Sequence, residues 1–184
     1  ARPVHSQILS AAGVRAQFGS MGKPWNAGIA AAAGVECALL AAAGMTAASD
    51  GLFGPQGMVA THSDAPGDWP DTADFLFADV KYKLHACCHG THAMIEGLLA
   101  LGALSEVTAL HLRTAPRWMT VCNIPTPRTG LEVKFSYRWL AAMVLSGRPT
   151  ADEAAYTDAC AMDPALAALA ARVPRAHMSP TTAE

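Results

Sequence analysis

Charged side chains are scarce in this sequence. Only 15% of the 184 residues are Asp, Glu, Lys or Arg, while 52% are hydrophobic, and an ordinary globular domain is about one quarter charged. A surface so poor in charge predicts that part of it meets another surface, such as a second copy of the chain. Basic residues form no run and no strip with aromatic residues, and the formal net charge is -2. These absences argue against a nucleic-acid-binding protein.

Signals for secretion, cross-linking and membrane insertion are also missing. Residues 1–20 contain no charged start followed by an apolar run, so no signal peptide is predicted. The five cysteines are irregularly spaced and include no C-x-x-C pair, which favours a reduced, cytoplasmic setting. The apolar stretch at 27–48 is mostly Ala and Gly and contains Glu36. We therefore predict a buried helix of a soluble protein there, not a membrane span.

Local signals predict a helical first part, residues 1–77, and a second part of mixed helix and strand, residues 78–184. In the first part they favour two helices and then a loop rich in Gly, Pro and Asp, the helices being 5–18 (before Gly19) and 26–43 (before Gly44). Pro24 suits the first position of the second helix. The small side chains of that helix indicate the interior of a helical bundle.

The second part carries signals for both strands and helices. The predicted strands are 78–84 and 106–115, and the predicted helices are 89–103, 132–146 (closed by Gly147) and 163–172 (capped by Asp163). Thr150 and Glu153 have the spacing of a capping box for another short helix. The tail from Val173 onward is expected to be poorly ordered.

The segment KLHACCHGTH, residues 83–92, gathers the most reactive side chains of the chain. Zinc is one interpretation, because histidine and cysteine are its usual ligands. The spacing does not favour it, since adjacent cysteines cannot easily point at one ion. A strained disulfide between Cys87 and Cys88 is a second interpretation, and two small buried thiols are a third.

A catalytic interpretation uses the position of this segment before a predicted helix. Helix N-termini attract carboxylates through their unpaired N–H groups, and Lys83 and Thr91 would add a charge and a hydroxyl. The same dipole would keep His89 or His92 neutral and able to move a proton. Such a site would bind polycarboxylic acids. A second turn that suits anions, GSMGKPWNAG, contains Lys23 but matches no phosphate-binding motif.

Three blocks of sequence, taken in order, resemble the MmgE/PrpD family. They are GSMGKPWNAGIAAAAGVECALLAAAG, VKYKLHACCHGTHAMIEGLLAL and KFSYRWLAAMVLSGR, at residues 19–44, 80–101 and 134–148. The family includes 2-methylcitrate dehydratases, cis-aconitate decarboxylases and iminodisuccinate epimerases. Its members have a large helical domain and a smaller α+β lid, with the active site between them. The resemblance implies a mostly α fold, with the end of the helical domain followed by a partial α+β lid.

The resemblance also implies roles for individual residues. It suggests Lys83, His92 and His89 as catalytic groups. The residues that it suggests for substrate binding are Lys23, Asn26, Cys88, Thr91, Lys134 and Tyr137, with Trp139 as an alternative to Tyr137. It implies no metal or organic cofactor. The chain departs from many relatives at Asn26, where they carry histidine, and at Cys88, where some decarboxylases use histidine.

The chemistry shared by the family is removal of a proton next to a carboxylate, which cationic side chains and N–H groups would stabilise. We therefore expect a lyase acting on a small di- or tricarboxylic acid, similar to 2-methylcitrate dehydratase. An epimerase of an aspartate-derived diacid is the alternative. A homodimer is expected, with no nucleic-acid or membrane partner. A third hypothesis is a non-catalytic fragment, because family chains begin with a helical stretch that this sequence does not show.

Overall fold

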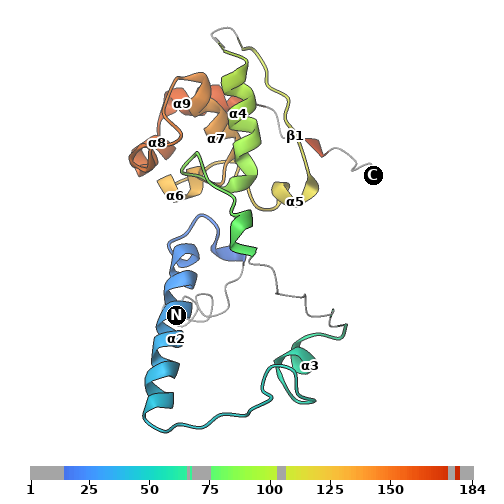
Figure 1. Cartoon of the computed structure of the whole chain (residues 1–184). Coiled ribbons are helices and arrows are strands. Elements are labelled where there is room, and N and C mark those ends of the chain that lie inside the picture. Colours follow the sequence, from blue (N-terminus) through green and yellow to red (C-terminus); the bar gives the residue numbers. More distant parts are fainter. Residues whose placement is uncertain (1–14, 66, 68–75, 103–106, 174–176, 179–184) are drawn as a thin grey trace. The chain divides into compact units, whose positions relative to one another are not determined.

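The computed structural model describes residues 15–65, 67, 76–102, 107–173 and 177–178 (Figure 1). Within these ranges the chain is mostly helical, and its only strands are β1 (Arg113–Thr114) and β2 (His177–Met178). Contacts divide the chain into two compact units. The main unit comprises Ala1–Ala27 and Lys83–Glu184, and the inserted unit comprises Gly28–Tyr82. The helical character expected from the sequence is confirmed, whereas an α+β lid is not.

The longest helix, α2 (Gly22–Ala42), begins earlier than the predicted range of 26–43. Alanine, the strongest helix former, accounts for much of it. None of its residues is buried, so the prediction of a buried helix is wrong for this structure. Among the described helices, α2 alone has the length and hydropathy to cross a membrane, a test that core helices of soluble proteins also pass.

The end of α2 follows the sequence closely. Gly44 adopts a φ of +94°, which glycine accepts without the strain that a Cβ would cause. Its N–H donates to the carbonyl of Ala41 at 3.0 Å, and the N–H of Met45 donates to that of Leu40 at 2.9 Å. These two bonds form a Schellman motif. The predicted stop at Gly44 is therefore confirmed. Among its described residues, the inserted unit contains one further α-helix, α3 (Met58–His62).

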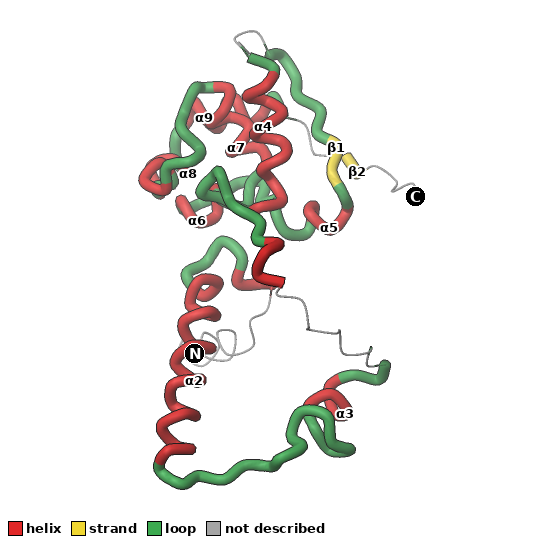
Figure 2. Tube along the Cα trace, viewed as in Figure 1, coloured by secondary structure: helices red, strands yellow, loops and turns green. Residues whose placement is uncertain are grey.

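Three helices hold the core of the main unit (Figure 2). They are α4 (His92–Ala100), α7 (Tyr137–Leu145) and α9 (Pro164–Ala171). The central helix α7 packs against both of the others, and Ile95, Leu140 and Leu166 are fully buried between them. Asp163 caps α9 by accepting from the backbone N–H groups of Ala165 and Leu166, as the sequence predicted.

Shorter helices complete the main unit. They are α5 (Pro116–Met119), α6 (Gly130–Val133) and α8 (Asp158–Ala161), with 3-10 turns at Arg15–Gln17, His89–Thr91 and Glu153–Ala155. Another 3-10 turn, Leu76–Asp79, belongs to the inserted unit. The predicted helix at 89–103 is present as the turn His89–Thr91 followed by α4, and its last predicted residue lies outside the described ranges. Of the predicted helix 5–18, only residues 15–18 are described, and they contain the 3-10 turn Arg15–Gln17.

Both predicted strands are largely wrong. Residues 80–84 form no strand, and Val80, Tyr82 and Leu84 are exposed. Among residues 107–115, the described part of the predicted strand 106–115, only β1 pairs, in parallel with β2. Leu110 and Leu112 pack on the core as half-buried side chains, so the alternating pattern reflects burial without a ladder. The tail predicted to be poorly ordered contributes β2, and Val173 is buried in the core.

The predicted helix 132–146 is interrupted. Phe135 accepts from the N–H of Ile124 and Tyr137 donates to the carbonyl of Cys122, both at 3.0 Å, so this stretch pairs with a loop instead of continuing the helix. Ser136 then caps α7 by accepting from the N–H of Trp139. The predicted closure of α7 by Gly147 is confirmed by its φ of +71°.

The predicted capping box at Thr150 and Glu153 is also wrong. Asp152 caps the turn Glu153–Ala155 instead. The Thr150 hydroxyl lies 2.8 Å from Nδ1 of His85, and Glu153 pairs with Lys134. Both side chains therefore bind residues that are distant in the sequence instead of capping the helix.

Candidate active site

A cavity of about 310 Å³ opens on the main unit. Its walls come from segments that are distant in the sequence: Ser20, Lys23 and Pro24; Lys83 and 86–88; Leu131, Lys134 and Phe135; and Glu153. Three lysines face one carboxylate on this lining. The cavity is therefore suited to an anion.

Aromatic packing brings Lys23 to the cavity. The rings of Phe18 and Phe135 stack with their centres 5.3 Å apart. The Lys23 ammonium lies 5.6 Å from the centre of the Phe18 ring and 5.4 Å from that of Phe135, which is within cation–π range. The described residues offer Lys23 no carboxylate partner. Its charge is thus held at the cavity by rings that leave it available to an anion.

The other two lysines differ in how their charges are engaged. Lys83 Nζ donates to the carbonyl of Cys87 at 3.2 Å and meets no carboxylate among the described residues. Lys134 Nζ lies 2.9 Å from Oε1 of Glu153 and 5.2 Å from the centre of the Tyr156 ring. The hydrogen bond from Lys134 lowers the pKa of the Glu153 carboxyl. Because Glu153 is 85% exposed, this pair is weak enough for an incoming carboxylate to replace Glu153.

The adjacent cysteines have opposite environments. Burial raises the pKa of Cys87, whose Sγ lies 3.1 Å from Oγ1 of Thr91. The pKa of Cys88 is lowered to about 6, chiefly by a hydrogen bond from the Cys122 thiol and further by the Gly90 N–H and nearby lysines. The same bond raises the pKa of Cys122. The two shifts favour the thiolate form at Cys88 and the protonated form at Cys122. None of the five cysteines takes part in a disulfide.

Three histidine rings pack together beside the start of α4. The ring of His92 stacks on that of His89 with the centres 5.0 Å apart and meets that of His85 edge-on at 5.1 Å. Burial and the neighbouring cationic groups lower the pKa of His92, so it is neutral at pH 7. Its Nε2 is buried and meets no hydrogen-bond partner within the part of the chain that the structure describes. His85 is fixed between Glu96 and Thr150, each at 2.8 Å. Among the described residues, no three His, Cys, Asp or Glu side chains gather as a metal site.

A sequence profile of the MmgE/PrpD C-terminal domain matches residues 85–183, which is more than half of the chain. This chain belongs to the MmgE/PrpD family. Among curated proteins, no significant match is found. The resemblance to the family is thereby confirmed. The match includes the cysteines and histidines of residues 85–92 and α7, whereas Lys23 and Lys83 lie before it.

Only some of the residues that the MmgE/PrpD resemblance suggests for the site line the cavity. Lys23, Lys83, Cys88 and Lys134 line it. His92 is 9% exposed and His89 is exposed, but neither histidine lines the cavity. Asn26 is half-buried near the start of α2 and is not on the lining either.

Thr91 and Tyr137 are engaged in internal hydrogen bonds. The fully buried Thr91 hydroxyl donates to the carbonyl of Cys88 at 2.7 Å. The Tyr137 hydroxyl donates to the carbonyl of Gly90 at 2.9 Å and lies 3.1 Å from Oγ1 of Thr114. Burial raises the pKa of Tyr137 to about 12, so it stays protonated. Both side chains therefore hold the turn His89–Thr91, the HGT turn, in place.

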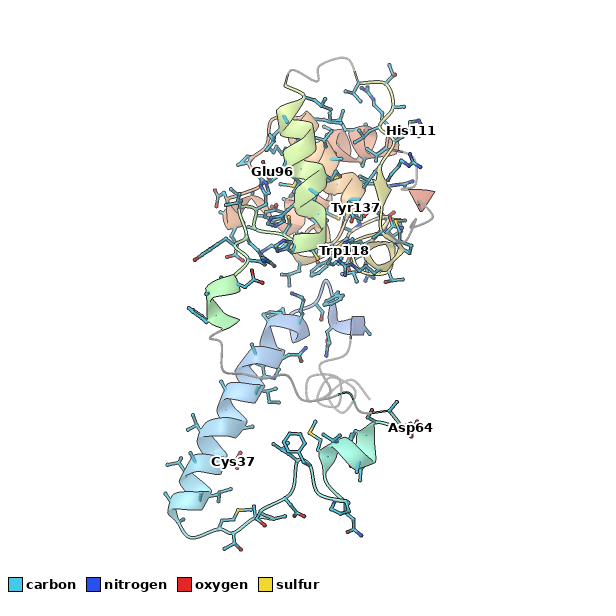
Figure 3. The ribbon with its side chains drawn as sticks, turned by 45° about the vertical axis from the view of Figure 1, so that its right-hand side comes forward. Cys37, Asp64, Glu96, His111, Trp118 and Tyr137 are labelled. Atoms are coloured by element: carbon cyan, nitrogen blue, oxygen red, sulfur yellow. The ribbon has the colours of Figure 1, made fainter. Side chains whose placement is uncertain are left out.

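Trp118 also packs on this turn, and Figure 3 labels Trp118 and Tyr137 among the side chains of the main unit. A Cβ added at Gly90 would lie 2.4 Å from Cε3 of Trp118, so the turn requires glycine at this position. Sequence reasoning missed Trp118, together with Cys122, Glu153, Phe18 and Phe135. All five act through contacts with residues distant in the sequence. Of these five residues, only Phe135 lies in a block that the family resemblance had indicated, residues 134–148.

Proposed function

We propose that this chain carries the carboxylate-binding and proton-transfer part of an MmgE/PrpD lyase acting on a small di- or tricarboxylic acid, similar to 2-methylcitrate dehydratase. The carrying observation is the convergence of Lys23, Lys83 and Lys134 on one cavity. Two of these cations meet no carboxylate among the described residues. Their charge favours a polyanion with two or more carboxylates.

The three lysines divide two roles in this proposal. Lys23 and Lys134 bind carboxylates of the substrate, and one of these carboxylates replaces Glu153 as the partner of Lys134. Lys83, as the unprotonated amine, takes the proton from the carbon next to a bound carboxylate and becomes an ammonium group. The negative charge that develops on that carboxylate is stabilised by the remaining ammonium groups. Loss of hydroxide from the neighbouring carbon then gives the unsaturated acid.

Proton NMR in heavy water tests this proposal. We expect the α-proton signal of a hydroxylated tricarboxylate such as 2-methylcitrate to disappear in the presence of the protein. The signal should persist with Lys83→Ala and with Lys83→Arg, because arginine keeps the charge but cannot release its proton. Lys81→Ala is the matched control: Lys81 lies outside the cavity, beside Asp79, and the variant should exchange like the unaltered chain.

The products separate the lyase from the epimerase. Formation of the signal of a methyl group on a carbon–carbon double bond, shifted from the methyl signal of 2-methylcitrate, supports dehydration. Exchange without an unsaturated product, seen with an aspartate-derived diacid, would replace the lyase by an epimerase and keep the role of Lys83. Exchange that survives Lys83→Arg would remove Lys83 from the mechanism.

A further inference from the structure

Cys88 differs from every other cysteine in this chain. Its side chain is half-buried on the wall of the lysine cavity. Cys87, Cys122 and Cys160 are each at most 4% exposed. Cys37 is exposed on α2, beside Glu36. Cys88 therefore combines access from the cavity with a cationic surrounding.

The surroundings of Cys88 favour a nucleophile. Cys88 lines the cavity together with Lys23, Lys83 and Lys134, and hydrogen bonding to Cys122 and the charges of Lys83 and Lys23 lower its pKa to about 6. Its backbone is fixed as well, because its N–H donates to the carbonyl of Lys134 at 3.0 Å. A thiolate in such a setting is reactive because it is both ionised and accessible.

We propose that Cys88 is a covalent capture site for carboxylates that carry an electrophilic carbon, namely α-halo acids and α,β-unsaturated diacids. The lysines attract the carboxylate into the cavity, where the sulfur attacks the neighbouring carbon. This inference rests on the carboxylate-binding half of the proposed function and is independent of proton removal by Lys83.

The reaction is balanced in both cases. With an α-halo acid, the thiolate forms a carbon–sulfur bond and halide leaves with the electron pair of the broken bond. With an α,β-unsaturated diacid, sulfur bonds to one alkene carbon and the π electrons move to the other, which takes a proton from water. No oxidant or reductant is needed, and the product is a stable thioether.

A pair of alkylating reagents tests the proposal within one protein. Iodoacetate carries a carboxylate, and iodoacetamide is its neutral counterpart. The native chain is treated with each at equal concentration, and alkylation of Cys88 and Cys37 is measured by peptide mass spectrometry. We expect the iodoacetate-to-iodoacetamide rate ratio to be about 10-fold or more higher at Cys88 than at Cys37, the low end of electrostatic focusing by a charged cleft. Equal ratios at the two cysteines would overturn the proposal.

Lysine variants identify the source of the selectivity. Lys23→Met and Lys83→Met should each bring the rate ratio at Cys88 closer to that at Cys37. Lys81→Met is the control and should leave the ratio unchanged. Selectivity that survives both cavity variants would show that these lysines do not guide the reagent, and would overturn the proposal.

Maleate extends the test to an unsaturated diacid. We expect a succinyl thioether on Cys88 and none on Cys37. Failure of maleate to modify Cys88, under conditions in which iodoacetate does, would remove unsaturated diacids from the proposal. Selective alkylation without α-proton exchange would instead contradict the proposed lyase and leave the capture site standing. Loss of both would contradict carboxylate binding by the cavity.

Discussion

The helices α2 and α7 show two ways in which this chain forms a helix. α2 has 21 residues and buries none of them, and Val35 and Leu39 on it are 63% and 67% exposed. α7 has only nine residues, of which six are buried. Alanine propensity is enough to form the first, whereas packing supports the second. Apolar composition therefore marks a helix in this chain without telling where that helix packs.

Shortening a leucine to alanine should give the largest difference in the free energy of unfolding between the two helices. Leu140 on α7 is fully buried, so we expect Leu140→Ala to lower the free energy of unfolding of the main unit by about 2–5 kcal/mol. Leu39→Ala on α2 should change it by less than about 0.5 kcal/mol. Urea unfolding followed by the fluorescence of the buried Trp139 measures both. A similar loss in the two variants would contradict the comparison.

Two glycine-to-alanine changes should have opposite effects. A Cβ at Gly130 in α6 would lie 1.9 Å from the carbonyl oxygen of Tyr156, whereas one at Gly34 in α2 would meet no atom within 4 Å. Gly130→Ala should therefore destabilise the main unit by about 1–3 kcal/mol. Gly34→Ala should favour helix α2 by about 1 kcal/mol. Urea unfolding reports the first and far-UV circular dichroism the second; tolerance of Gly130→Ala would contradict the close packing of α6.

Removing a tyrosine hydroxyl should matter only in the main unit. Tyr137→Phe leaves the carbonyl of Gly90 without its hydrogen bond, which should cost about 1 kcal/mol. Tyr82 in the inserted unit is 78% exposed, and Tyr82→Phe should have no measurable effect. Thermal melts of the two variants provide the measurement. An unchanged melt for Tyr137→Phe would show that the HGT turn is not held by this bond.

The adjacent cysteines should differ in their response to pH. The hydrogen bond from Cys122 lowers the pKa of Cys88 to about 6, so the thiolate fraction falls as the pH falls through 6. The rate of iodoacetamide alkylation at Cys88 should be half-maximal near pH 6. Cys87, whose pKa is raised by burial, should stay unmodified in the folded chain throughout this range. A half-maximal rate near pH 9 at Cys88 would contradict the Cys122 hydrogen bond.

Signals within a few residues predicted the ends of several helices correctly. Gly44, Gly147 and Asp163 act through the backbone groups beside them, so their roles can be inferred from local sequence. The break before α7 could not be inferred, because it depends on pairing with Cys122 and Ile124. The strand predictions were wrong for a related reason. Alternating apolar residues indicate that one face is buried, but a strand also needs a neighbouring strand with which to form hydrogen bonds.

The cavity depends even more on contacts between distant segments. Nothing in the local sequence relates Lys134 to Glu153, or Cys88 to Cys122. The joint placement of Lys23, Lys83 and Lys134 followed from the family resemblance alone. Cys88 and Thr91 were both predicted to bind substrate, yet only Cys88 lines the cavity, because the Thr91 hydroxyl turns inward to the carbonyl of Cys88.

The central claim is that the lysine cavity binds carboxylates, and titration calorimetry with tricarballylate tests it most directly. This triacid lacks a hydroxyl group to eliminate, so binding is measured without turnover. The account predicts saturable binding that weakens as salt is added, is lost in the Lys23→Met/Lys83→Met double variant and is kept in Lys81→Met. Equal binding by the double variant, or none by the unaltered chain, would contradict it.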